Sequence, residues 1–163
     1  MFSKLIFTAA FFVALTAASP IQEVEASSAA PGNCPPDFFQ AYSTFQCFQI
    51  FNDSKIFIDA ELYCNGLGGH LASIHSGFDN MLITGKARSI IGENSTLFTG
   101  GNNLQSQNTW QWVDMESMDY TDFDFPMESD PYKNCLQIFT DHGKWKAGDC
   151  YTAASFVCEV YRS

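Results

Sequence analysis

The spacing of apolar residues predicts two helices in the first half of the chain. Over residues 54–67 the apolar side chains recur at steps of three and four, as in an amphipathic helix, and two consecutive glycines follow. We expect Ser54 to be the N-cap of this helix. A second helix over residues 76–87 is predicted by Ser76, which is followed three positions later by Asp79 in the pattern of a capping box.

Short aromatic and apolar segments predict strands on both sides of these helices. Residues 34–50 place aromatic side chains around short polar gaps, as a hairpin does. After Gly92 the expected strands are residues 96–100, 110–113, 136–140, 144–146 and 156–160. Helices followed by strands indicate a mixed α+β domain. The long irregular segment over residues 114–134 is of a kind that commonly carries function.

The amino terminus has the pattern of a secretory signal peptide. Lys4 precedes an apolar run that ends in small residues, and we expect cleavage after Ala18, which gives a signal peptide over residues 1–18. The run is shorter than the roughly 20 residues of a membrane-spanning helix. Residues 19–32 have no apolar period and predict a flexible leader. We therefore predict a secreted, extracellular protein without membrane insertion, with one domain over residues 33–161.

Charge and cysteine content narrow the class further. The sequence holds 8 Lys and Arg against 18 Asp and Glu, a formal charge of −10. Nucleic acids and anionic membranes rely on clustered basic residues, so we exclude both as partners. The 6 cysteines form an even set, which predicts disulfides in a secreted chain, although their spacing leaves the pairing open. No zinc-binding spacing of Cys and His is present in the sequence.

Four short motifs follow one another along the chain. They are residues 60–64, GGHLASIHS at residues 68–76, WQWVD at residues 110–114 and FVCE at residues 156–159. Together they resemble the C-type lectin-like domain, over roughly residues 34–161. The resemblance implies an α+β fold in which two helices pack on small antiparallel sheets beside a long irregular loop region. It also implies three disulfides, which are Cys34–Cys47, Cys64–Cys158 and Cys135–Cys150.

The resemblance further implies where calcium would bind. Sugar-binding members of the family hold Ca²⁺ through oxygen ligands on each side of a cis-proline and through an Asn-Asp pair after a strand tryptophan. That tryptophan is Trp145 here, but Lys146 and Ala147 follow it and offer an ammonium and a methyl group. Neither Pro126 nor Pro131 has an oxygen ligand on both sides. We expect no calcium in the usual position and no required cofactor.

Acidic residues crowd the irregular segment, which holds no Lys or Arg between residues 114 and 130. Three interpretations stay open: an alternative calcium site, an acidic face for a cationic partner, and a solvated surface. The candidate ligand-binding residues from this segment and the neighbouring strand are Glu116, Asp119, Asp122, Asp124, Glu128, Asp130 and Trp145.

Three other features of the sequence have both a functional and a structural explanation. Trp110 and Trp112 alternate along one strand, and we interpret them as core residues rather than as a platform for sugar stacking. His75 beside Ser76 suggests nucleophilic catalysis, but Ser76 is better explained as a helix cap. The sequons at Asn52 and Asn94 predict N-glycosylation, with Asn94 the better candidate because it lies in a polar loop.

These observations predict a secreted lectin-like recognition module and argue against an enzyme. We expect carbohydrate binding in which the usual calcium-bridged site is degenerate. The alternative is a domain of the same fold that binds protein and not sugar. The partner is therefore an extracellular glycan or an extracellular protein, and the sequence leaves the oligomeric state open.

Overall fold

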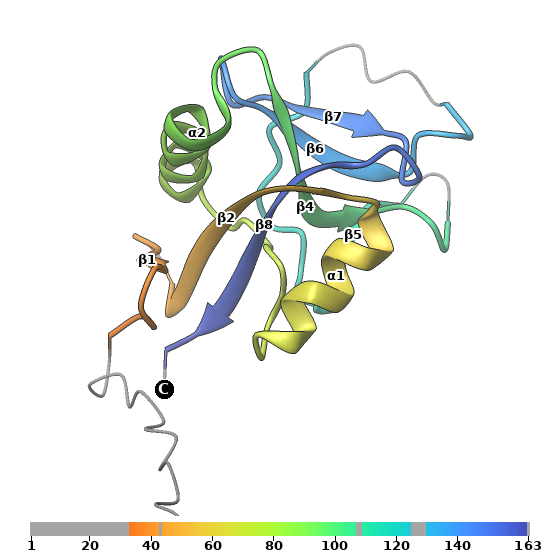
Figure 1. Ribbon diagram of the computed structural model, residues 1–163. Helices are drawn as coiled ribbons and strands as arrows, with labels where there is room; N and C mark the ends of the chain where they lie inside the picture. Colours follow the sequence, from red (N-terminus) through yellow and green to blue (C-terminus); the bar gives the residue numbers. More distant parts are fainter. Residues whose placement is uncertain (1–32, 43, 107–108, 125–129, 163) are drawn as a thin grey trace, which may run out of the picture.

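A computed structural model describes residues 33–42, 44–106, 109–124 and 130–162 (Figure 1). The predicted signal peptide over residues 1–18 and leader over residues 19–32 lie outside the described residues. In chain order the elements are β1 (Phe39–Gln40), β2 (Gln46–Lys55), α1 (Phe57–Gly66), β3 (His70–Leu71), α2 (Gly77–Ile91), β4 (Thr96–Asn102), β5 (Gln111–Trp112), β6 (Cys135–Phe139), β7 (Trp145–Gly148) and β8 (Ala154–Tyr161).

The strands join in one eight-stranded sheet. Its main path runs β1-β2-β8-β4-β6-β7, with β3 paired to β8 and β5 paired to β4. Every pair is antiparallel except β4 and β8, where Leu97 lies opposite Ser155 in parallel register. The separate antiparallel sheets that we expected are therefore continuous, because β8 lies between β2 and β4 and joins the early hairpin to the later strands (Figure 1).

The start of α1 differs from the sequence prediction. Ser54 belongs to β2, whose pairing with β8 is irregular after Phe51 and resumes at Lys55, so the strand continues past the position where the helix was expected to begin. The N-cap is Ile56, whose side chain makes no capping hydrogen bond. Ser54 as N-cap is therefore wrong. The first helical N–H, that of Phe57, donates instead to the carbonyl of Cys150 at 3.0 Å.

The start of α2 matches the prediction, and its end lies further on. Ser76 is the N-cap, and its hydroxyl accepts a hydrogen bond from the N–H of Asp79 at 3.1 Å. The helix continues to Ile91, one turn beyond the expected end at Ala87. That last turn is held from outside the helix, because Arg88 donates to the carbonyl of Thr140.

Two apolar clusters lie against the sheet. The larger cluster packs Ile83 and Ala87 of α2 against the fully buried Trp112 and Trp145, whose ring centroids lie 5.7 Å apart. The smaller cluster packs Phe57, Ala60 and Cys64 of α1 against Phe98 and Phe156. Burial of each large apolar side chain contributes about 1.5–3 kcal/mol to the stability of the fold. The two helices therefore attach to different parts of the sheet.

Three disulfides tie these parts together. They are Cys34–Cys47, Cys64–Cys158 and Cys135–Cys150, the pairs that the family resemblance implied. The bond from α1 to β8 closes the widest loop, with a sequence separation of 94 residues. In the chain-entropy model the disulfide that closes this loop stabilises the folded state most, by about 4–5 kcal/mol. None of the described helices has the length and apolar character needed to span a bilayer.

Gly69 provides a test of the close contact between the α1–β3 turn and β8. A Cβ at this position would overlap the carbonyl oxygen of Glu159 and lie 2.9 Å from a methyl of Val160. We expect Gly69→Ala to lower the free energy of unfolding by about 3 kcal/mol, since backbone must move to admit the methyl group. The measurement is urea unfolding of the oxidised protein.

Gly85→Ala is the matched control for this substitution. Gly85 lies in α2, and a Cβ there meets nothing within 4 Å. The gain in helix propensity should raise stability by about 1 kcal/mol. Equal stabilities for the two variants would contradict the close contact at Gly69.

Candidate ligand-binding pocket

The strand that carries the expected calcium ligands holds a lysine and an alanine at those positions instead. Lys146 and Ala147 lie in β7, and the ammonium of Lys146 sits 4.9 Å from the ring centroid of Phe139. Burial lowers the pKa of Lys146, and the nearby ammonium of Lys133 lowers it further. Lys133 also pairs with Asp130 at 3.1 Å. Calcium needs about six to eight oxygen ligands. Lys146, Ala147 and an Asp130 already paired with a lysine do not fit it.

The first acidic candidates of the irregular segment converge on a histidine. Glu116 and Asp119 lie at 2.8 Å from the Nε2 and Nδ1 atoms of His75, respectively. The hydrogen bond from His75 lowers the pKa of Asp119. These two carboxylates therefore fasten the irregular segment to the link between β3 and α2, while their side chains stay 42% and 60% exposed.

The other acidic candidates are spread apart. Asp122 pairs with Lys144 and also accepts from the amide of Asn80 at 3.3 Å. Asp124 is exposed, and Glu128 lies outside the described residues. No three Asp, Glu, His or Cys side chains in the described ranges come together to hold a metal ion. The acidic part of the segment has no lysine of its own, and its carboxylates pair with lysines from the neighbouring parts of the chain.

Trp145 lies beneath the irregular segment, which packs on its indole ring. It is fully buried, and its indole N–H donates to the amide oxygen of Asn80 at 2.8 Å. Tyr120 and Phe123 pack edge-on against it, with centroid distances of 5.4 and 5.5 Å. The structure therefore places this candidate residue in the core. Trp112 is also fully buried, and Trp110 packs half-buried against the same cluster, as expected for core residues.

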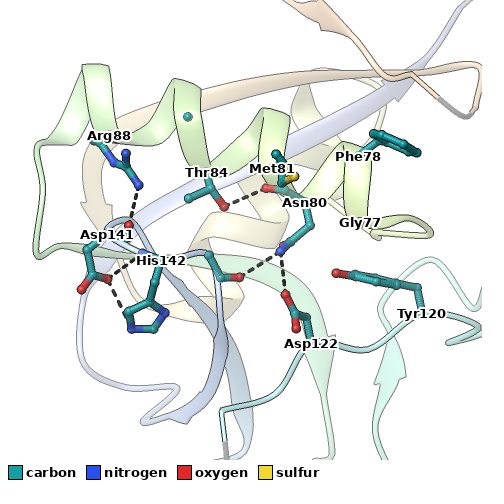
Figure 2. A pocket seen from close by; sticks show the side chains of 12 residues that line it. Gly77, Phe78, Asn80, Met81, Thr84, Arg88, Tyr120, Asp122, Asp141 and His142 are labelled. Carbon is teal, nitrogen blue, oxygen red and sulfur yellow. Dashed lines mark hydrogen bonds and ion pairs between the residues drawn. The ribbon is translucent and has the colours of Figure 1, made fainter.

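A pocket of about 710 Å³ opens between α2, the Tyr120–Asp122 segment and the turn after β6 (Figure 2). Its volume lies within the range of about 300–1,000 Å³ that is typical of small-ligand sites. Phe78 and Met81 form an apolar rim and are 73% and 72% exposed. Sequence reasoning identified Asp122 but missed the residues that α2 contributes, because their apolar and amide side chains carry no distinguishing motif.

The polar groups of this pocket are held in place by the protein. The amide of Asn80 donates to the carbonyl of Gly143 at 2.9 Å, while its oxygen accepts from Trp145. Arg88 donates to the carbonyls of Thr140 and Asp141. Burial and the nearby Asp122 raise the pKa of Tyr120 to about 12, so its phenol stays protonated at neutral pH. The pocket thus places polar groups in fixed positions beside two aromatic rings.

A second concavity of about 530 Å³ lies between α1 and β5. Its margin is apolar, and the side chains that project there from four separate segments are Ile58, Leu104, Met115 and Tyr151, which are 54–81% exposed. Amide side chains of Asn102, Gln105 and Gln111 also line it. This groove is the more apolar of the two concavities.

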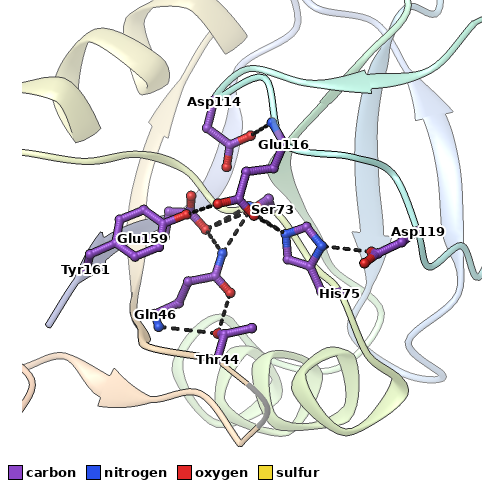
Figure 3. Close-up of polar contacts among 9 residues, drawn as sticks. All are labelled: Thr44, Gln46, Ser73, His75, Asp114, Glu116, Asp119, Glu159 and Tyr161. Atoms are coloured by element: carbon purple, nitrogen blue, oxygen red, sulfur yellow. Dashed lines mark hydrogen bonds and ion pairs between the residues drawn. The ribbon is translucent and has the colours of Figure 1, made fainter.

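A buried polar cluster lies on the other side of the irregular segment (Figure 3). At its centre is Glu159 of β8, which is fully buried. One carboxyl oxygen of Glu159 accepts from Gln46 at 2.6 Å and from the N–H and hydroxyl of Ser73 at 3.0 Å each. Burial raises the pKa of Glu159 well above its ordinary range, and the adjacent carboxyl of Asp114 raises it further.

The same cluster contains a Ser-His-Asp arrangement that the sequence did not indicate. His75 lies 3.1 Å from the hydroxyl of Ser73 and 2.8 Å from Asp119. These spacings match those of a hydrolytic triad. However, Ser73 is fully buried and its hydroxyl donates to Glu159, so no substrate reaches this oxygen. The arrangement serves to position the segment and supplies no accessible nucleophile.

Comparison with known proteins gives the family of this disulfide-bonded domain. A model of the lectin C-type domain matches residues 53–160, and the chain belongs to this family. It is 30% identical over 132 residues to "C-type lectin mannose-binding isoform" of Oxyuranus scutellatus, covering 77% of this chain and 82% of that protein.

Two further relatives show the same likeness. "Snaclec clone 2100755" of Deinagkistrodon acutus is 33% identical over 115 residues, with 69% of this chain and 71% of that protein covered. Among solved structures, herring type II antifreeze protein is 26% identical and has a TM-score of 0.71, covering 80% of this chain and all of that one. The family therefore includes relatives whose names point to different ligands.

The cations around β7 lead to a direct prediction about calcium. A ligand at about a hundred times its Kd stabilises a protein by about 2.7 kcal/mol, which raises Tm by several degrees. Because Lys146 and Ala147 supply no oxygen ligand, we expect millimolar calcium to leave Tm unchanged in differential scanning calorimetry. A saturable rise in Tm that chelator reverses would contradict this interpretation.

Proposed function

We propose that this chain is an extracellular recognition domain that binds an uncharged glycan without calcium, in the pocket between α2 and the Tyr120–Asp122 segment. The observation that carries the proposal is the combination of Phe78 and Tyr120 with fixed polar groups in one pocket of about 710 Å³. Sugar rings present apolar C–H faces and hydroxyl edges, which suit aromatic rings and hydrogen-bonding groups respectively. Secretion is part of the proposal, supported by the signal-peptide pattern and three disulfides.

The charges of the pocket support a neutral ligand. Asp122 is offset by Lys144, and Arg88 turns its guanidinium toward backbone carbonyls. Neither a strongly cationic nor a strongly anionic group gains from entering such a site. The name of the 30% identical relative, which describes it as mannose-binding, also supports a carbohydrate ligand.

A protein ligand is the second candidate function, and a separate observation favours it. The groove between α1 and β5 exposes Leu104, Met115 and Tyr151 beside one another at its margin. Exposed apolar side chains that gather at one place often mark a protein-binding surface. In this interpretation the partner's apolar side chains enter the groove, and the pocket beside α2 has no role in binding.

A glycan array read with calcium and again with chelator tests the proposal. We expect the same glycans to bind in both conditions, because calcium has no place in the proposed contact. Binding that disappears with chelator would refute the calcium-free mechanism. A silent array in both conditions would favour the protein-binding candidate.

Phe78→Ala then tests where the glycan binds. Removing the ring should weaken binding about tenfold, or about 1.4 kcal/mol, a part of what burial of one Phe side chain is worth. Phe45→Ala is the matched control, since Phe45 is also 73% exposed but does not line the pocket. Equal affinities for the two variants, measured by isothermal titration calorimetry with an array hit, would place the site elsewhere.

Passage through the secretory pathway also predicts N-glycosylation, and the structure offers both acceptors at the surface. Asn94 lies exposed in the turn between α2 and β4, with a φ of 60°, and Asn52 lies exposed in β2. We propose Asn94 as the principal site, because a turn gives freer access than a paired strand. Intact mass should fall by one glycan on enzymatic deglycosylation, and Asn94→Gln but not Asn52→Gln should abolish the change.

A further inference from the structure

Two carboxyl oxygens face each other in the buried cluster beneath the irregular segment. Among the described residues, neither Oε1 of Glu159 nor Oδ2 of Asp114 has a hydrogen-bond partner, and both atoms are inaccessible to solvent. The side chains of Asp114 and Glu159 are nevertheless within hydrogen-bonding range of each other. Two ionised carboxylates in this arrangement would repel, whereas one proton between them would satisfy both atoms.

The other oxygen of each carboxyl group already has its partners. Oε2 of Glu159 accepts from Gln46 and twice from Ser73. Oδ1 of Asp114 accepts from the backbone N–H of Glu116 at 2.9 Å. The only oxygens left to carry a proton are therefore the two that face each other.

The pair lies where the chain passes from β5 into the wall of the pocket. Next to it, Glu116 accepts from the phenol of Tyr161 and also contacts His75, which in turn holds Asp119 (Figure 3). Tyr120 of the pocket wall follows Asp119 directly. Residues 114–119 are therefore attached to the rest of the protein through hydrogen bonds made by their carboxyl groups.

The remaining charged groups nearby do not neutralise the pair. His70, which is the cross-strand neighbour of Glu159 in β3, is paired with Glu61 of α1 at 2.7 Å. Arg162, beyond the end of β8, donates to the carbonyl of Thr44. Glu116 and Tyr161 bring no positive charge to the pair, and the His75 ring is held between the carboxylates of Glu116 and Asp119.

We propose that Asp114 and Glu159 share one proton, and that this proton fastens residues 114–119 to β8, so that a rise in pH frees the wall of the ligand pocket. The tether itself is independent of any ligand. Its effect on binding rests on the proposed function, because Tyr120 borders the pocket in question. We therefore expect ligand binding in the pocket to be strongest at mildly acidic pH and to weaken as the shared proton dissociates.

The sign of the pH effect follows from linkage. The pKa of Glu159 is raised in the folded protein, by burial first and then by Asp114. The folded state therefore binds more protons than the unfolded state above the ordinary glutamate pKa of about 4.3. The stabilisation is complete below that value and is lost as pH rises through the raised pKa of the folded state.

Amide substitutions test the shared proton, because each single amide imitates one protonated form. In Glu159→Gln the amide N–H can donate to Asp114, and in Asp114→Asn the amide N–H can donate to Glu159. The double variant instead places two N–H donors opposite each other. Asp124→Asn, which alters an exposed carboxylate further along the same segment, is the control.

Urea unfolding of the oxidised proteins from about pH 4.5 to about pH 9 is the measurement, without ligand. For the parent protein we expect the unfolding constant to rise by up to about tenfold per pH unit over part of this range, the slope for one proton. Glu159→Gln should lose that dependence, and Asp114→Asn should weaken it while Glu159 stays buried. The Asp124→Asn control should retain it, and the double variant should be less stable than the single effects predict together. His75 is unchanged in every variant, so the comparison isolates the two carboxyl groups.

Hydrogen exchange of residues 114–120 supplies a local measurement. Corrected for intrinsic rates, exchange in this segment of the parent protein should accelerate over the same pH range, and the single variants should remain protected. Single variants that keep the parent's pH dependence, or additive effects in the double variant, would overturn the proposal. So would added calcium or sodium that stabilises the parent but not the single variants, since a cation would then lie between the oxygens. None of these outcomes depends on glycan binding.

Discussion

The hydrogen bond from the buried indole of Trp145 to Asn80 determines how the parts of the ligand pocket meet. Trp145 begins β7, and Asn80 lies one turn into α2, so this bond fixes the helix relative to the sheet. Tyr120 and Phe123 pack on the same indole and thereby set the position of the irregular segment. An unpaired indole N–H in the core would cost about 1–3 kcal/mol. The pocket is therefore a product of core packing.

Features with a short-range cause were predicted from the sequence. Ser76 caps α2 because its hydroxyl needs only the N–H three residues later, and that pairing is visible in a few letters of sequence. The family resemblance supplied the three disulfides, which spacing alone left open. The start of α1 could not be predicted in the same way. Lys55 remains in β2 because of its pairing with Ala154, a residue far away in the sequence.

At the candidate site, too, the sequence showed the residue types but not the long-range contacts that they make. The acidic residues were visible in the sequence, but their partners His75, Lys133 and Lys144 were not, since each contact depends on the folded chain. Gln46 and Glu159 are 113 residues apart in the sequence and share a hydrogen bond. A polar contact between such distant residues has no periodic signature. The departure of Lys146 and Ala147 from the family pattern was readable because the resemblance fixed their place beside Trp145.

The central position of β8 in the sheet has a consequence for how the protein is made. This strand is the last in the chain, yet it pairs with both β2 and β4, from Gln46 opposite Tyr161 to Leu97 opposite Ser155. The ribosome releases the residues of β8 after all the other strands of the sheet, so the sheet cannot close before β8 has emerged. Cys64 must likewise wait for Cys158 as its partner. Such long-range pairing folds slowly and leaves β2 exposed in the meantime. The nascent chain should therefore depend on chaperones and disulfide isomerases until β8 has emerged.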